Sequence, residues 1–154
     1  MRFLILILPF VIIINLSYAD VIINEIMYDP LQNENYNEWL ELYNNGTDDI
    51  DILNWTICQK SVLGGYINKS GALLLNTTTN IKADSYAIIT DGGDNGTEVY
   101  DNFNVLNESA AFHINAASIC SGLSNNGKEL VIFNGAINFS VTYADTADEG
   151  YSLE

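Results

Sequence analysis

Hydrophobic residues recur at every second position through much of this 154-residue chain, and this alternation constrains its fold more than any other feature. Successive side chains of a β-strand point to opposite faces of the sheet, so alternation produces one apolar face and one polar face. Beyond the N-terminal apolar run, no window keeps the spacing of an amphipathic helix over several turns. The chain is therefore predicted to be all-β.

Short alternating runs separated by turn-forming residues mark the expected strands. The last two flank Asn134-Gly135, which favours a two-residue hairpin turn because both turn positions need a positive φ. Many short strands without intervening helices predict an antiparallel β-sandwich, with a β-barrel as the structural alternative. The strands are expected at residues 21–27, 38–43, 50–57, 72–75, 86–90, 129–133 and 136–143.

The N-terminus predicts export. Met1-Arg2 precedes an apolar run over residues 3–14, and Ser17-Tyr18-Ala19 then places small residues at the −3 and −1 positions of a cleavage site. The run is shorter than the ~20 residues that a spanning helix needs, which favours a cleaved signal peptide over a membrane anchor. Removal of residues 1–19 is expected to leave residues 20–154 as one secreted or cell-surface domain, without a membrane span.

The chain is strongly acidic, with 20 Asp and Glu residues against five Lys and Arg and a formal net charge of −15. Binding to nucleic acids depends largely on Lys and Arg that neutralise phosphates, so this composition argues against a nucleic-acid partner. An extracellular protein or a component of the cell envelope is the expected partner.

Cys58 and Cys120 are the only cysteines. An even number in an oxidising exterior suggests one disulfide, and neither cysteine has a second Cys or a His at the spacing of a zinc site. The sequence leaves two alternatives, a Cys58–Cys120 disulfide or two unlinked thiols.

Seven asparagines stand in Asn-X-Ser/Thr sequences, the acceptor of N-linked glycosylation. This is more than chance placement would give, so the pattern favours a glycoprotein from the cell exterior. The seven are Asn45, Asn54, Asn68, Asn76, Asn95, Asn107 and Asn138.

The acidic loop over residues 91–98 is the best candidate for a metal site. Calcium is bound in proteins by about six to eight oxygen atoms. The loop departs from the EF-hand pattern because Gly93 occupies the third ligand position, so a solvated loop without a cofactor is the preferred interpretation. The candidate calcium ligands are Asp91, Asp94, Asn95 and Glu98.

No constellation of residues predicts catalysis. His113 is the only histidine, and no G-x-S-x-G motif accompanies it. Glu38 and Glu41 lie three residues apart, on opposite faces of the expected strand, so structural roles are preferred for them and for Glu25 over a glycosidase-type pair.

The aromatic residues divide between the core and the surface. Trp39, Tyr43 and Trp55 are expected in the sandwich core. Tyrosines in loops or at strand edges are the better candidates for a contact surface: Tyr28, Tyr36, Tyr66, Tyr100 and Tyr151.

The order of these motifs resembles the lamin-tail domain family, most specifically in Glu-Trp-Leu-Glu-Leu-Tyr at residues 38–43. The resemblance implies an immunoglobulin-like β-sandwich and a non-catalytic module, found at the tails of nuclear lamins and on exported prokaryotic proteins. Asn54 stands where the family usually has a glycine before the tryptophan, and Ala83-Asp84-Ser85 stands where a Pro-Gly turn is usual. The matching segments are residues 23–30, 38–46, 50–57, 86–91, 123–133, 141–143 and 151–154.

An exported interaction or cell-surface structural module, rather than an enzyme, is therefore the function predicted from the sequence. The alternative from another class is a calcium-assisted carbohydrate-binding or adhesion domain.

Secreted protein is expected to begin at Asp20, because the cleavage signal ends at Ala19. N-terminal sequencing and the intact mass of secreted material measure this directly. Retention of residues 1–19 in a membrane fraction would contradict it.

Overall fold

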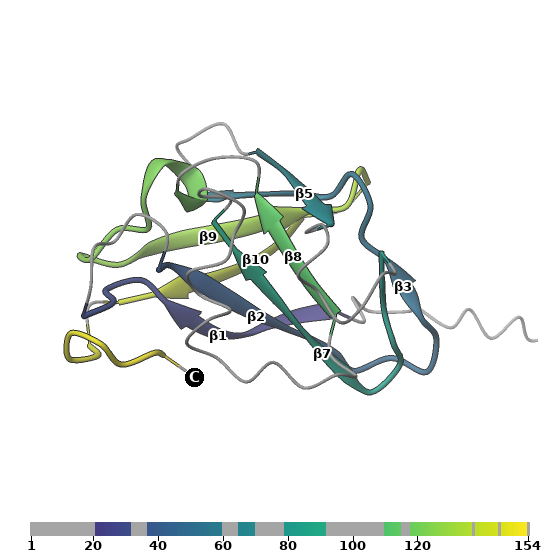
Figure 1. Ribbon diagram of the computed structural model, residues 1–154, viewed down its shortest axis with the longest axis horizontal. Helices are drawn as coiled ribbons and strands as arrows, with labels where there is room; N and C mark the ends of the chain where they lie inside the picture. Colours follow the sequence, from purple (N-terminus) through teal and green to yellow (C-terminus); the bar gives the residue numbers. More distant parts are fainter. Residues whose placement is uncertain are drawn as a thin grey trace, which may run out of the picture.

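A computed structural model describes residues 21–31, 37–59, 65–69, 79–91, 110–114, 118–136, 138–144 and 146–153. Within them lie ten β-strands and one short 3-10 turn, η1, so the all-β prediction is confirmed (Figure 1). The strands are β1 (Val21–Met27), β2 (Trp39–Asn44), β3 (Ile50–Asp51), β4 (Thr56–Gln59), β5 (Gly65–Lys69), β6 (Asn80–Ile81), β7 (Ser85–Thr90), β8 (Ala110–Ile114), β9 (Lys128–Phe133) and β10 (Asn138–Tyr143), and η1 spans Ile119–Ser121.

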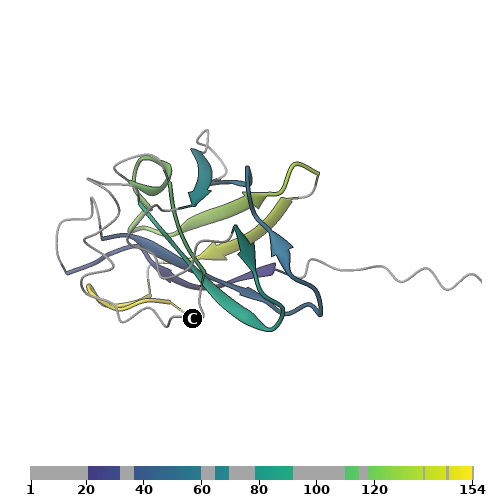
Figure 2. The ribbon, with the colours of Figure 1, turned by 45° about the vertical axis from the view of Figure 1, so that its right-hand side comes forward.

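Eight strands form one continuous sheet in the order β1-β2-β7-β8-β5-β4-β9-β10. The sheet folds over on itself, so that β1, β2 and β7 lie across β9 and β10 (Figure 2). Strands β3 and β6 pair separately at one end of the molecule. Every described pair is antiparallel except β7–β8, which is parallel. The predicted immunoglobulin-like β-sandwich is confirmed, with this one parallel pair as an exception.

Alternate residues of the strands fill the core between the two layers. Leu40 and Leu42 of β2 are wholly buried, and Ile57 of β4 lies beside Ile132 of β9 in the same cluster. Trp55 is also buried there and stacks on Phe139, with ring centroids 5.8 Å apart. The prediction that Trp55 belongs to the core is confirmed.

The prediction that Trp39 and Tyr43 also face this core is wrong. The two leucines of β2 point inward, so their neighbours point to the outer face of the sheet. Trp39 is nevertheless buried, because it packs with Met27 and Ile88 in a second cluster. Tyr43 stays partly exposed. Both faces of β2 carry large apolar side chains, so alternation alone could not identify the inner face.

The predicted strand over residues 50–57 is interrupted by a turn. The Trp55 N–H donates to the Ile52 carbonyl at 3.1 Å, and Asn54 between them has a φ of 65°. This left-handed conformation is open to glycine and, among other residues, best tolerated by Asn and Asp. Asp84, before β7, has a φ of 52°. At both positions the chain lacks the glycine that is usual in the family, but Asn and Asp also tolerate the left-handed conformation found there.

The β9–β10 hairpin forms where the sequence predicts it, but its turn is longer. Phe133 pairs with Asn138, so four residues connect the strands rather than two. Gly135 has a φ of 95°, whereas the side chain of Asn134 accepts the N–H of Ala136 at 2.9 Å. The predicted two-residue turn is wrong, because such a turn needs a positive φ at both positions and Asn134 does not have one. The strand predicted at residues 72–75 lies outside the described residues.

A buried carboxylate precedes β2. Glu38 is 0% exposed, and its Oε1 and Oε2 accept the backbone N–H groups of Leu123 at 2.6 Å and Ile119 at 3.2 Å. These donors flank Cys120 and Ser121, which have φ values of 55° and 66°. A buried charge is tolerated only where hydrogen bonds compensate for its lost hydration. Glu38 thereby holds a left-handed turn that lies more than 80 residues later in the chain.

Replacement of the buried carboxylate by an amide, Glu38→Gln, is expected to lower the free energy of unfolding by about 1.5–3 kcal/mol, the range for hydrogen bonds to charged groups. The amide nitrogen of the variant is a donor. It would face a backbone N–H that in the wild type is bonded to a carboxylate oxygen. Urea denaturation measures the loss. The matched control Glu149→Gln, at an exposed carboxylate, should change stability by less than about 0.5 kcal/mol. Equal stabilities for the two variants would contradict the role of Glu38.

Candidate interaction surface

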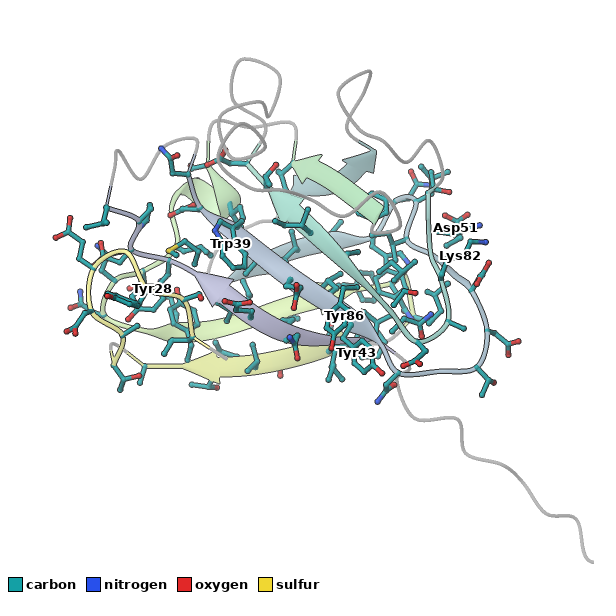
Figure 3. All side chains as sticks on the ribbon, turned by 60° about the horizontal axis from the view of Figure 1, so that its bottom comes forward. Tyr28, Trp39, Tyr43, Asp51, Lys82 and Tyr86 are labelled. Atoms are coloured by element: carbon teal, nitrogen blue, oxygen red, sulfur yellow. The ribbon has the colours of Figure 1, made fainter. Side chains whose placement is uncertain are left out.

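Two tyrosines and an isoleucine form a row across the outer face of β1, β2 and β7. Tyr43 lies directly opposite Ile22 on one side and Tyr86 on the other. The tyrosine rings are stacked, with centroids 4.7 Å apart and an interplanar angle of 28° (Figure 3). Ile22 is 42% exposed and Tyr86 is 44% exposed. We call Ile22, Tyr43 and Tyr86 the tyrosine face.

An acidic residue borders the tyrosine face. The hydroxyl of Tyr43 donates to the carboxylate of Asp84, in the turn before β7. This hydrogen bond, together with burial and the negative charge of Asp84, raises the pKa of Tyr43 above its usual range. The contact fixes the ring of Tyr43 and places a negative charge beside the stacked pair.

Asp49 and Asp51, two members of the nearby acidic cluster of residues 48, 49 and 51, have structural roles. Lys82 donates to Asp49, whose other oxygen accepts the N–H of Ala83, and these bonds lower the pKa of Asp49. Asp51 accepts the N–H of Leu53 at 2.9 Å. Since the charge of Lys82 is paired with Asp49, the described surroundings of the tyrosine face remain predominantly acidic.

The candidate calcium ligands are only partly described. Asp91 directly follows β7 and is buried, with 1% of its surface exposed. Asp94, Asn95 and Glu98 lie outside the described residues. Within the described part of the chain, no group of three or more His, Cys, Asp or Glu side chains is arranged to hold a metal ion. The calcium site stays a sequence prediction.

The three glutamates considered for catalysis are all hydrogen-bonded within the fold. Glu41 lies on the outer face, opposite the inward-pointing Glu38, as their spacing predicted. Glu41 accepts a bond of 2.7 Å from Asn24, which lies at a β-bulge in β1, and Glu25 accepts one from the Ser152 hydroxyl. The side chain of His113 lies outside the described set. These carboxylates serve as acceptors for neighbouring elements of the sandwich.

Cys58 and Cys120 are both buried, and no disulfide joins them in this structure. The thiol of Cys120 donates to the backbone carbonyl of Ile57, at 3.2 Å, and Ile57 directly precedes Cys58. The two cysteines therefore lie in one region of the core. A disulfide between them in an oxidising exterior stays a prediction.

The family model described as Lamin Tail Domain matches residues 15–145 of the chain. The chain belongs to the lamin tail domain family. Lamin tail domains are non-catalytic immunoglobulin-like domains, in agreement with the sandwich described above. No curated protein and no solved structure matches this chain. Among the described residues of this lamin tail domain, no helix is long and apolar enough to cross a membrane.

The predicted glycosylation sites of this lamin tail domain are partly described. Asn45, Asn54 and Asn138 are exposed, in a loop, a turn and at the start of β10. Asn68 lies on β5, with its side chain outside the described set, and Asn76, Asn95 and Asn107 lie outside the described residues. Exposure makes the first three accessible, and glycosylation at all seven stays a prediction.

One of the five tyrosines predicted for a contact surface is buried instead. Tyr28 is wholly buried, where its hydroxyl accepts the N–H of Ala147 at 3.2 Å and its ring lies 5.2 Å from that of Tyr143. Tyr151 is 68% exposed, as expected. The side chains of the other three candidates, Tyr36, Tyr66 and Tyr100, lie outside the described set. Tyr86 was missed, because its stacking on Tyr43 depends on a strand pairing that the sequence does not display.

Replacement of the acceptor of the Tyr43 hydroxyl, Asp84→Asn, is expected to lower the pKa of Tyr43 toward its ordinary value of about 10. Asn also tolerates the left-handed backbone at this position. An NMR titration of the tyrosine ring carbons measures the shift. The control Asp148→Asn, at an exposed carboxylate, should leave Tyr43 unchanged.

The sign of the linked effect on stability follows from the raised pKa. The folded state holds the Tyr43 proton more tightly than the unfolded chain, so this contribution is present below about pH 10. It is lost as pH rises through the pKa of Tyr43. An unchanged Tyr43 titration in Asp84→Asn would contradict the assigned cause.

Proposed function

We propose that this lamin tail domain is an exported, non-catalytic interaction module that binds a basic protein at the cell exterior through its tyrosine face. The observation that carries the proposal is the stacked pair of Tyr43 and Tyr86, displayed beside Ile22 on a sheet face. Export is supported by the predicted signal peptide at residues 1–19 and by the seven glycosylation sequences.

Tyrosine is well suited to such a contact. Its ring buries a large area while few rotatable bonds are immobilised, and tyrosine is enriched at the centres of protein interfaces. Stacking and the bond to Asp84 already order Tyr43 before any partner binds. A preorganised surface loses less conformational entropy on binding, which favours affinity.

The charge of the domain indicates the chemistry of the partner. The chain carries a net charge of −15, and Asp84 lies directly beside the ring pair. Complementary charge accelerates association and discriminates against acidic partners. The exposed ring of Tyr86 can also bind the cation of a Lys or Arg side chain through a cation–π interaction. We therefore expect a basic surface on a protein or on a protein component of the cell envelope.

The non-catalytic part of the proposal is supported by the carboxylates themselves. Glu38 is enclosed by backbone donors, and Glu25 and Glu41 are acceptors for Ser152 and Asn24. Each has a structural hydrogen bond, which favours a scaffold over a general acid and base pair.

Truncation of the exposed ring, Tyr86→Ala, is expected to weaken partner binding at least about tenfold, since interface tyrosines are frequent hot spots. Immobilised secreted domain would be incubated with solubilised cell-surface protein in ~0.15 M salt, and captured proteins quantified by mass spectrometry. The matched control Tyr151→Ala removes an exposed tyrosine elsewhere and should retain capture. The proposal is contradicted if both variants retain the same basic partners as the wild type.

A further inference from the structure

The outer face of the second layer carries one of the predicted glycosylation sites. Strands β4, β9 and β10 pair side by side in this layer, across the sandwich from β1, β2 and β7 (Figure 2). Asn138 begins β10 and is exposed. Asn45 and Asn54, the other two described sites with exposed side chains, lie outside the strands. Of these three, Asn138 is therefore the one held in a fixed relation to a neighbouring strand.

The middle residue of this site fixes the direction of the other two. Phe139 lies between Asn138 and Ser140, packs against the core and stacks on Trp55. Successive side chains of a strand point to opposite faces, so the asparagine and the serine point outward together. Both are exposed. The inward ring thereby presents the acceptor amide and the required hydroxyl on one accessible surface.

An exposed aromatic ring stands directly opposite the acceptor. Phe133 of β9 is the ladder partner of Asn138, and it is 39% exposed. Residues directly opposite in an antiparallel pair have their Cβ atoms about 4.5–5.5 Å apart on the same face. Thr56 of β4 is the partner of Phe133 on its other side. The ring therefore lies within reach of the first sugar of a chain attached to Asn138.

The acceptor amide is not engaged by the fold. Among the described residues, the side chain of Asn138 has no hydrogen-bond partner. In the same hairpin, by contrast, the side chain of Asn134 accepts the N–H of Ala136. Attachment of a sugar at Asn138 breaks no such described contact.

We propose that Asn138 carries an N-linked glycan whose first sugar packs on the ring of Phe133. The donor is a lipid-linked sugar phosphate of the exporting membrane. The amide nitrogen of Asn138 forms a bond to C1 of the sugar and loses a proton, while the bond between C1 and the phosphate oxygen breaks and the lipid phosphate leaves. The proposal rests on the export of the domain proposed above, because this modification belongs to secreted proteins.

The chemistry of the sugar suits the exposed ring. One face of the pyranose ring of N-acetylglucosamine presents C–H bonds and no hydroxyl, whereas the face of an aromatic ring is electrically negative. Their contact removes apolar surface of both from water. It also places the sugar over Phe133 and Asn138 together, so that it pins β9 to β10 at the hairpin. The tyrosine face lies on the other layer and stays uncovered by this glycan.

Occupancy of Asn138 is measured on the domain secreted by its own cells. Protease digestion and mass spectrometry should find a glycan on this residue in most molecules. Ser140→Ala keeps Asn138 but removes the hydroxyl that the modification requires, so its peptide should be unmodified. An unmodified Asn138 in secreted wild-type protein would overturn the proposal and leave the tyrosine face untouched. Absence of the domain from the secreted and cell-surface fractions would instead contradict export, and with it both proposals.

The contact with Phe133 is tested by thermal melts of secreted variants. We expect Phe133→Ala to lower the Tm by at least about 2 °C more in the glycosylated domain than in the Ser140→Ala background, because only the glycosylated domain has a sugar on the ring. The matched control Tyr151→Ala truncates an exposed aromatic ring elsewhere. It should lower the Tm equally in both backgrounds.

Further variants keep this comparison decisive. If Phe133→Ala is not secreted, Phe133→Leu takes its place, since leucine keeps apolar bulk but lacks an aromatic face. Phe133→Trp should retain the difference between the two backgrounds. Equal shifts of the Tm in both backgrounds would overturn the contact between sugar and ring, even where Asn138 is glycosylated.

Discussion

The buried carboxylate of Glu38 joins the two layers of the sandwich. It accepts the N–H groups of Ile119 and Leu123, on either side of a turn. This turn contains residues in the left-handed conformation, which a regular strand cannot contain. That turn brings the thiol of Cys120 to the carbonyl of Ile57, on β4 of the second layer. One ionisable side chain at the entrance to β2 therefore fixes how a distant, irregular segment packs against the core. Without it, buried backbone donors would lose their acceptor, at a cost that is large relative to a small domain's net stability.

The far end of β2 is held in a similar way. Asn44 is wholly buried, and its side-chain nitrogen contacts the carbonyls of Asp48, Ile81 and Lys82 at 2.9–3.1 Å. These bonds position the connection that leads into Asp84 and β7. With Glu38 and Asn44 both directed inward, β2 has only one possible orientation, and Tyr43 must point outward. The tyrosine face is thus a consequence of two buried polar residues on the opposite side of the same strand.

The sequence predicted most strands, because alternation and turn residues act locally. It failed where the outcome depends on contacts between distant segments. Alternation continues through Asn54, so the turn that separates β3 from β4 becomes visible only with the backbone conformation of that residue. Tyr28 follows a strand and looks peripheral, yet the segment around Ala147 covers it. The Tyr43–Tyr86 pair joins segments whose register is set by the whole sheet.

The acidity of the domain and its exposed tyrosine face fit together physically. Exposed apolar surface promotes association between identical chains, and a large net charge opposes it. Here the side chains of Ile22 and Tyr86 are uncharged and exposed, whereas the chain as a whole is strongly negative. Two copies that approach one another repel over about 8 Å at physiological salt, while a basic protein surface is attracted over the same range. The same charge that keeps copies of the domain apart would therefore select the basic partner that the tyrosine face is proposed to bind.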